Sequence, residues 1–463
     1  MNAQRVFLLE FNELCPSLLK EFMDRGFLPN FRRLYESSIV LTTDAGEKPP
    51  HLEPWIQWPT VHTGTPYADH GAFHLGDGRR ITRKGVAELL SDAGIPVGVL
   101  GSMNMNYTSL HGYVVPDPWD PLGQACPEWL ETFYRTVADQ VQESSRTKSD
   151  SKRQMLQFGW FLANHGLTSG SVCSVVTQLF QERYDPGIKW RRASLLEHLQ
   201  YDLFRYLNRR FNIRFATFFA NSTAHYQHYY WRNMEPERFA VPPLEVDHPS
   251  LREAIEYGYR SMDKLLGRFL IDYPDVMLVL VTALSQQPWV ETTKCTYRPN
   301  RFEELLRFAG ISPEGLAIKP VMAEEFHVEC PDEPTTDRVK DALSGLSING
   351  EPLMKVDRSE NTLFGGCNIQ ELMDMDQMVS RSKDGAMRRF GDLFYMVHCM
   401  RSGRHHPDGA LWIRTGCHRV VEQRVPLTAI APTILERFGV PQPDYMLGHA
   451  LAVESDPAVA TTN

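Results

Sequence analysis

Three near-continuous apolar runs, each followed within three residues by polar residues, constrain the fold of this chain most strongly. They are residues 5–11 (RVFLLEF), 213–220 (IRFATFFA) and 276–282 (VMLVLVT). Runs of this kind are typical of strands that are buried on both faces of a parallel sheet. Segments with helical patterning separate the runs, so the sequence predicts an α/β fold in which helices sandwich a mostly parallel sheet.

The other predicted elements fit the same plan. Helices are predicted at residues 16–25, 29–37, 84–93, 193–211, 250–270 and 425–439, and shorter strands at 96–100 and 410–415. Several of these helices are followed by glycine, which favours a helix end. The 463 residues are predicted to form one α/β domain over 1–455, with a helical insertion at 121–195, a smaller α+β cap insertion at 297–400 and a disordered tail at 456–463.

Polar residues follow each apolar run at the edge where ligands bind in open α/β sheets, just outside the carboxyl ends of the strands. Asn12 and Glu13 follow the first run, Asn221 follows the second, and Ser285 and Gln286 follow the third. We therefore expect these side chains to contribute to a site. An alternative for Asn12 is that its side chain caps the next helix.

Residues 49–78 (PPHLEPWIQWPTVHTGTPYADHGAFHLGDG) combine proline, tryptophan and titratable residues without a periodic apolar pattern. Three prolines limit helix formation, which predicts one or two turns at about residues 59–63, ended by Gly64. The segment brings the candidate site residues Glu53, Gln57, Thr60 and Thr63. Its tryptophans would form apolar walls that exclude water. The alternative is a surface loop with incidental histidines.

Composition excludes several classes of protein. The net charge of −9 argues against nucleic acid or an anionic membrane as the main partner. Eight cysteines lie far apart without a Cys-x-x-Cys pair, which excludes a zinc ribbon and favours reduced thiols in the cytoplasm. The first residues do not resemble a signal peptide, and the longest apolar run is too short to span a bilayer.

Six segments in order carry a family resemblance: residues 11–34, TGTPYADHG (63–71), NSTAH (221–225), YRSMDKLLGRFL (259–270), HHPDGALWIRTG (405–416) and APTILERFGVPQPDYMLGHAL (431–451). Their order and spacing resemble the alkaline phosphatase superfamily, in particular its type I phosphodiesterase and nucleotide pyrophosphatase branch. The resemblance implies two metal ions, commonly zinc, that hold a phosphoryl group while a Ser or Thr hydroxyl attacks it in line.

Residue by residue, the resemblance implies an incomplete metal centre. One ion would be held at Asn221, His225 and His405, where both histidines are kept. The other site has Asn12 in place of an aspartate and Leu284-Ser285 in place of an Asp-His pair. Because Leu is no ligand and neutral Asn is a poor one, a two-metal centre is not expected, and the implied cofactor is at most one zinc or other divalent cation.

The resemblance implies a divergent enzyme that hydrolyses or transfers a phosphate, sulfate or related ester group, with a small anionic substrate. Glu53 would act as base or carboxylate nucleophile, His225 would be catalytic, and Thr60 and Thr63 would offer hydroxyls. The alternative is a pseudoenzyme that keeps the fold as a binding or assembly protein. The enzyme is favoured because the residues at the altered positions are mostly polar.

Overall fold

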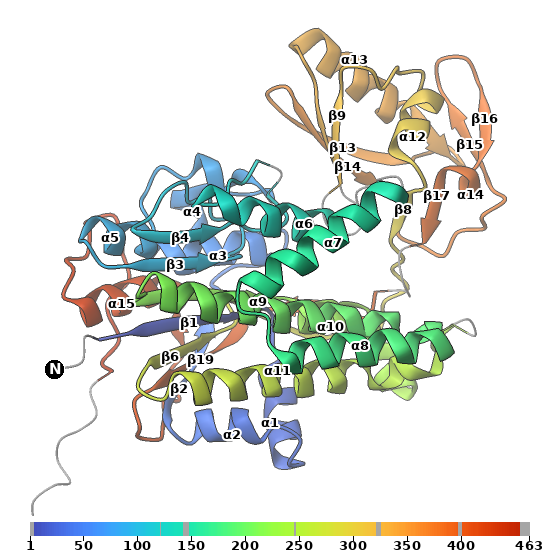
Figure 1. The fold of residues 1–463 in the computed structure, drawn as a ribbon. Helices are drawn as coiled ribbons and strands as arrows, with labels where there is room; N and C mark the ends of the chain where they lie inside the picture. Colours follow the sequence, from blue (N-terminus) through green and yellow to red (C-terminus); the bar gives the residue numbers. More distant parts are fainter. Residues whose placement is uncertain are drawn as a thin grey trace, which may run out of the picture.

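The computed structural model describes residues 4–120, 122–141, 148–244, 247–320, 326–396 and 401–453. In this part of the chain the central sheet has nine strands in the order β20-β2-β19-β6-β1-β5-β3-β4, with β21 beside β2 (Figure 1). The strands are β1 (Val6–Phe11), β2 (Ser38–Asp44), β3 (Val97–Leu100), β4 (Gly112–Val115), β5 (Phe215–Ala220), β6 (Met277–Val281), β19 (Asp408–Arg414), β20 (Arg419–Val420) and β21 (Val425–Pro426). Only β19 runs antiparallel to its neighbours. The predicted α/β class with a mostly parallel sheet is confirmed.

Successive side chains of β1 divide the core into two layers, because neighbours on a strand point to opposite faces. Phe7 and Leu9 pack with the layer that contains α1, α2, α9, α10 and α11, whereas Val6 and Leu8 pack with α3, α5 and α15. These helices are α1 (Pro16–Asp24), α2 (Pro29–Tyr35), α3 (Pro54–Thr63), α5 (Val86–Asp92), α9 (Arg192–Arg210), α10 (Ser222–Met234), α11 (Ala254–Asp272) and α15 (Ile430–Phe438). Helices on both faces explain why the strands are apolar throughout.

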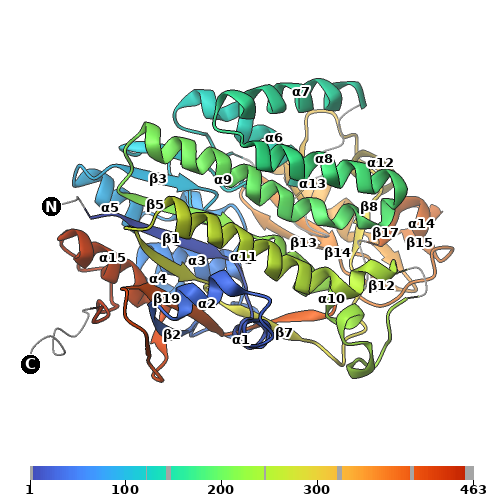
Figure 2. The ribbon, with the colours of Figure 1, turned by 60° about the horizontal axis from the view of Figure 1, so that its bottom comes forward.

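Further helices lie outside α9, as Figure 2 shows for α7 and α8. They are α6 (Glu131–Val141), α7 (Lys148–Asn164) and α8 (Ser169–Tyr184), and a short α4 (Tyr67–His70) follows α3. Phe133 of α6 and Phe158 of α7 join the same apolar cluster as Phe7 of β1. The region predicted as a helical insertion is therefore helical and packs on the main core, and its domain boundaries stay a prediction.

A smaller unit with its own apolar core lies at the upper right of Figure 1. Its elements are β8 (Tyr297–Pro299), α12 (Phe302–Ala309), β9 (Ala317–Pro320), β10 (Phe326–Glu329), α13 (Glu333–Ser344), β11 (Leu346–Ile348), β12 (Glu351–Pro352), β13 (Met354–Ser359), β14 (Thr362–Cys367), β15 (Met378–Arg381), β16 (Met387–Arg389), α14 (Phe390–Leu393) and β17 (Phe394–Met396). Val328, Leu343 and Phe390 are among its buried residues. The unit has the α+β content expected of the cap, whose limits stay a prediction. Residues 397–400 and the predicted tail at 456–463 lie outside the described residues.

The short helix predicted at residues 59–63 is wrong in length, because α3 extends from Pro54 to Thr63. Pro54 occupies the first turn, where its missing N–H costs nothing. Pro59 cannot donate to the carbonyl oxygen of Trp55, but Asn104 Nδ2 donates to that oxygen at 2.7 Å. The Asn104 side chain thus replaces the helical bond that Pro59 lacks. The predicted end at Gly64 is confirmed by its left-handed φ of 63°.

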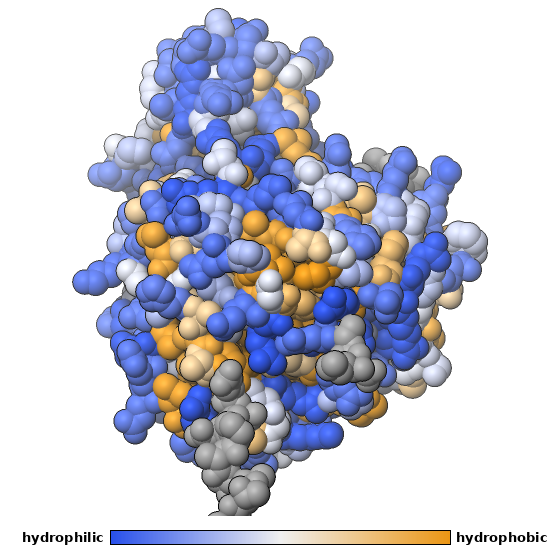
Figure 3. Space-filling view, turned by 90° about the vertical axis from the view of Figure 1, so that its left-hand side faces the viewer, coloured by the Kyte–Doolittle hydropathy of each residue, from blue (hydrophilic) through white to orange (hydrophobic). Residues whose placement is uncertain are grey.

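Figure 3 shows the side of the molecule where β1 begins. Hydrophobic residues gather near the middle of this face, among hydrophilic ones. The face lies at the amino-terminal end of β1, away from the polar residues that follow the strand. No helix of the described residues is long and apolar enough to cross a membrane.

Candidate functional site

Glu13, two residues beyond the end of β1, has an unusual backbone conformation. Its φ of 59° lies in the left-handed region, which few non-glycine residues adopt. The Glu13 carbonyl oxygen accepts a 2.7 Å hydrogen bond from Gln227 Nε2, and Gln227 Oε1 accepts one from the Tyr259 hydroxyl. Side chains of α10 and α11 thus fix Glu13 in place. Strained residues held by their surroundings cluster at functional sites.

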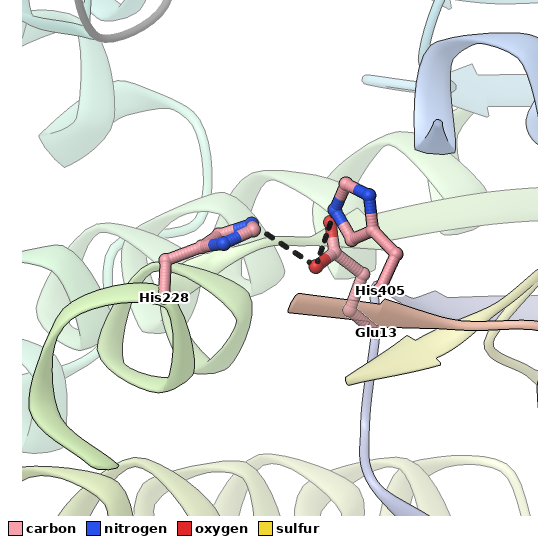
Figure 4. A group of neighbouring side chains, drawn as sticks. All are labelled: Glu13, His228 and His405. Atoms are coloured by element: carbon pink, nitrogen blue, oxygen red, sulfur yellow. Dashed lines mark ion pairs between the residues drawn. The ribbon is translucent and has the colours of Figure 1, made fainter. Parts of the chain in front are cut away.

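Two histidines approach the buried carboxylate of Glu13 from other elements (Figure 4). Glu13 Oε2 lies 3.2 Å from Nε2 of His228, on α10, and 3.4 Å from Nε2 of His405, on β18 (Gly403–His406). Ligand atoms of all three residues lie within 4.8 Å of one another. We call this group the Glu13 cluster. One carboxylate oxygen and two imidazole nitrogens form a donor set suited to zinc.

The topology explains why these residues meet. The carboxyl ends of β1 and β5 lie side by side in a parallel pair, so Glu13 and the start of α10 occupy one edge of the sheet. Because β19 is antiparallel, its amino end lies at this same edge. There β18, which immediately precedes it, pairs with β7 (Ser285–Pro288), with His405 opposite Gln286.

Amide side chains hold the Glu13 carboxylate. Asn12 Nδ2 donates to Glu13 Oε1 at 2.9 Å, and Gln286 Nε2 donates to Oε2. The same Asn12 amide donates to Asn221 Oδ1 at 2.7 Å, and Asn12 Oδ1 accepts from the Trp58 indole at 2.8 Å. The alternative that Asn12 caps the next helix is wrong, because α1 begins without a side-chain cap. Through these hydrogen bonds, Asn12 instead connects the ends of β1 and β5 with α3.

The charges of the cluster are strongly coupled. Burial raises the pKa of Glu13, but His228 and His405 together outweigh burial, so this pKa lies well below its usual value. Burial lowers the pKa of His405, but the charges of Glu53 and Glu13 more than offset it and raise the pKa to about 9. Burial lowers the pKa of His228, and Glu13 offsets this only in part. The two carboxylates therefore hold a positive charge at His405, where a metal cation would replace the proton.

The orientation of His405 fits metal binding. Its Nδ1 lies 2.9 Å from the carbonyl oxygen of Leu52, to which an Nδ1–H donates, whereas its buried Nε2 has no hydrogen-bond partner. A metal-binding histidine commonly donates its second ring N–H to a carbonyl in this way, which directs the other nitrogen toward the ion. His405 thus offers Nε2 to a cation beside Glu13, and the residues present fit a single zinc or similar divalent ion.

Glu53 lies on the open side of this cluster. It is the residue before α3, and its Oε2 is 3.3 Å from Nδ1 of His405. The Glu53 side chain is 31% exposed, in contrast to 2% for Glu13. Burial raises its pKa, and His405 opposes that rise. Glu53 thus combines contact with the cluster and access to water, as a general base requires.

The structure brings together a different ligand group from the predicted set of Asn221, His225 and His405. Only His405 belongs to the Glu13 cluster. Asn221 Oδ1 accepts from Asn12, and the ring of His225 lies against Tyr229 and its neighbours on α10. The i, i+4 spacing does not place His225 beside Glu13, because the side chain at i+7, His228, faces the carboxylate instead.

The other predicted residues differ in their distance from the cluster. Gln286 contacts Glu13 directly, whereas the Ser285 hydroxyl donates to the carbonyl oxygen of Asp408. Further along α3, the Thr60 hydroxyl lies 3.1 Å from His70 Nε2, and Thr63 donates to the Pro59 carbonyl at 2.7 Å. Gln57 Nε2 donates to the carbonyl of His51 at 2.9 Å. The catalytic roles of Thr60 and Thr63 stay a prediction.

The sequence predicts Glu13 as a site residue but not as a metal ligand, and it offers His228 only as one of several histidines that could complete a metal site. Glu13 was visible as the charged residue after the first buried strand, where ligand-binding residues gather. His228 was visible as the histidine on the same helical face as Asn221. The left-handed turn that directs Glu13 toward His228 has no signal in the sequence, because glutamate rarely adopts it.

Comparisons with known proteins give structural similarity alone. No protein-family model matches the chain, and no curated protein sequence matches it significantly. Similar solved structures include murine ectonucleotide pyrophosphatase/phosphodiesterase 5, at 10% identity and a TM-score of 0.40 over 97% of this chain and 98% of that one. Another is phosphonoacetate hydrolase from Sinorhizobium meliloti 1021 in complex with phosphonoformate, at 11% identity and a TM-score of 0.37 over 94% and 95%.

Proposed function

We propose that this protein hydrolyses or transfers a phosphate, sulfate or related ester group with the help of one divalent cation at the Glu13 cluster. The observation that carries the proposal is the convergence of Glu13, His228 and His405 at the carboxyl edge of the sheet, with Glu53 beside them. Three protein ligands are usual for catalytic zinc, which keeps a further position for water or substrate.

The chemistry follows from the donor set. A divalent cation at this place supplies positive charge that polarises an ester oxygen and attracts an anionic group. Glu53 accepts the proton of the attacking water or hydroxyl, since its carboxylate is partly exposed and lies next to His405. Gln286 and Asn12 hold the Glu13 carboxylate with the oxygen Oε2 toward both histidines.

The altered positions favour one ion over two. Asn12 donates through its amide to Glu13 and Asn221, so its nitrogen faces both oxygens. Leu284 is fully buried in the apolar layer, and the Ser285 hydroxyl bonds to a backbone carbonyl. The side chains at these positions thus take part in apolar packing or in hydrogen bonds within the protein. The cytoplasmic location predicted from the widely spaced cysteines belongs to the same proposal.

An assay of ester substrates tests the function. Purified protein loaded with zinc or manganese is incubated with p-nitrophenyl phosphate, bis-p-nitrophenyl phosphate and p-nitrophenyl sulfate. We expect chelator-sensitive turnover of at least one of them, which His405→Ala and His228→Ala abolish. If the loaded protein binds phosphate or sulfate at this site without turnover of any ester, the pseudoenzyme alternative replaces the enzyme.

A further inference from the structure

Helix α8 is inverted with respect to the usual pattern of a surface helix. Its buried side chains are the polar residues Ser171, Gln178 and Glu182. Its large apolar side chains face outward: Val172, Val176, Leu179, Phe180 and Tyr184, which we call the α8 stripe. Phe180 is 62% exposed and Tyr184 74% exposed. An apolar stripe of this kind marks an interaction surface.

Helix α7 adds two more exposed apolar side chains. Leu156 is 76% exposed and Trp160 is 73% exposed. Figure 2 shows α7 and α8 on the outer side of α9, away from the sheet. The exposed set therefore includes Trp, Phe and Tyr, the aromatic residues that are favoured at the boundary between hydrocarbon and headgroups of a bilayer.

A groove beside the α8 stripe is lined by basic residues. The groove lies between α8, α9 and α11 and has a volume of about 820 Å³. Its cations are Arg191, Arg205, Arg260, Lys264 and Arg268. Three of them form ion pairs with carboxylates: Arg205 with Asp272, Arg260 with Glu256, and Arg268 with Asp202.

Two cations of the groove remain available for a ligand. Among the described residues, Lys264 and Arg191 form no ion pair, and Nε of Arg191 is buried without a hydrogen-bond partner. The guanidinium of Arg191 lies over the rings of Trp190 and Tyr257, at 5.2 and 5.1 Å from their centroids. These ring contacts hold the guanidinium at the groove, and a guanidinium suits recognition of a phosphate.

The local charge favours an anionic partner. Residues 153–210 contain eight Lys or Arg and four Asp or Glu, a net charge of +4 in a chain whose total is −9. The net charge of the whole chain, on which the expectation against anionic membranes rests, does not reflect this basic region. A second copy of the chain placed on the α8 stripe would bring two such regions together, and like charges across an interface repel. Anionic headgroups complement them.

We propose that the α8 stripe and the adjacent groove dock on the surface of a membrane that contains anionic phospholipids. The apolar side chains of α8 enter the boundary between headgroups and acyl chains, and Arg191 and Lys264 bind lipid phosphates. This inference is independent of the proposed metal-assisted reaction, because none of these residues contacts the Glu13 cluster.

Vesicle sedimentation tests the inference. The full chain is mixed with vesicles of phosphatidylcholine alone or of phosphatidylcholine with phosphatidylglycerol. We expect binding only to the anionic vesicles. A Val176→Ser/Leu179→Ser/Phe180→Ser variant should lower the partition by roughly tenfold or more, because three apolar side chains no longer enter the bilayer. An Arg191→Gln/Lys264→Gln variant should lower it by roughly tenfold through lost charge.

A matched variant controls for the loss of exposed apolar surface in general. Leu372 and Met387, in the smaller unit, are 63% and 59% exposed, and Leu372→Ser/Met387→Ser should bind anionic vesicles like wild type. All variants change exposed or groove residues, and their melting temperatures verify folding. Equal binding by wild type and the stripe variant overturns the inference. Absence of vesicle binding by wild type also overturns the inference. This includes the case in which sedimentation equilibrium shows that wild type forms a dimer and the stripe variant does not.

Discussion

Nε2 of His228 lies 3.2 Å from Oε2 of Glu13, although one residue belongs to a helix that follows β5 and the other to the turn after β1. The contact joins two chain segments that meet only because β1 and β5 are adjacent parallel strands. Two residues far apart in sequence thereby become two of the three residues that could hold a metal ion.

Glu53→Gln should lower turnover by roughly a hundredfold or more and leave metal binding nearly unchanged, since an amide cannot accept the proton. The measurement compares kcat and bound zinc for the variant and wild type, on whichever ester proves to be turned over. Glu47→Gln, in the segment that precedes α3, is the matched control and should keep full activity. Full activity of Glu53→Gln would show that this carboxylate is structural.

Thr60→Val and Thr63→Val should keep zinc binding and turnover. The Thr60 hydroxyl bonds within α3 and to His70, and the Thr63 hydroxyl bonds within α3 and to Thr65. Neither has a hydrogen bond to Glu13. We expect each change to cost about 1 kcal/mol of stability through a lost hydrogen bond. If either variant folds and binds zinc but loses turnover, its hydroxyl is the nucleophile implied by the superfamily resemblance, and the assignment of roles here is wrong.

Asn104→Asp should destabilise the protein by about 1–3 kcal/mol, because the buried Trp55 carbonyl loses its donor and faces a carboxylate instead. The acceptor oxygen that receives the N–H groups of Gly76 and Gly78 is kept, so the variant removes the bonds that the Asn104 amide donates to the carbonyl oxygens of Trp55 and, at 3.2 Å, His74. Urea unfolding measures the difference. An unchanged free energy of unfolding would mean that α3 does not depend on Asn104.

Stability should fall below pH 6.5 in a way that depends on His70. Burial lowers the pKa of His70 from 6.5 to about 4, and its Nδ1 accepts from the Ala72 N–H. A folded-state pKa below the unfolded value means that protons bind the unfolded chain preferentially. The resulting stability is therefore present above pH 6.5 and lost as the pH falls toward 4, by about 2 kcal/mol at about pH 5.

His70→Gln is the corresponding variant, since its amide keeps a donor and an acceptor without a charge change. The free energy of unfolding from urea titrations at several pH values should fall less steeply for His70→Gln than for wild type. Parallel curves for the two proteins between pH 7 and pH 5 would contradict the assignment.

The sequence predicts the sheet well because strands that are buried on both faces consist mostly of apolar residues, which are easily recognised in the sequence. β1 and β5 are buried at every position and appear as near-continuous apolar runs, interrupted only by Glu10 and Thr217. The length of α3 was missed for the opposite reason. Propensity rules place Pro59 at the start of a helix and not inside one, and the compensating donor, Asn104, lies 49 residues from the Trp55 carbonyl that it contacts.

The site was predicted in part, at the correct edge of the sheet. Asn12, Asn221, Gln286 and His405 were identified because polar residues follow buried strands or because they match family segments. Glu13 was identified in the same way, but its contact with His228 was not, since the superfamily pattern assigns His225 where the structure turns His228 toward Glu13. A left-handed glutamate and the register of β18 on β7 are tertiary features that residue types alone do not predict.

Zinc binding by single-histidine variants tests the central claim most directly. Isothermal titration of zinc into metal-free protein should show one tight site in wild type and in His225→Ala, whose ring lies outside the ligand group. The same titration should show at least roughly tenfold weaker binding for His228→Ala and His405→Ala, because each loses a ligand. Zinc affinity that falls in His225→Ala and persists in His228→Ala, or the absence of zinc binding in wild type, would contradict a metal centre built on Glu13, His228 and His405.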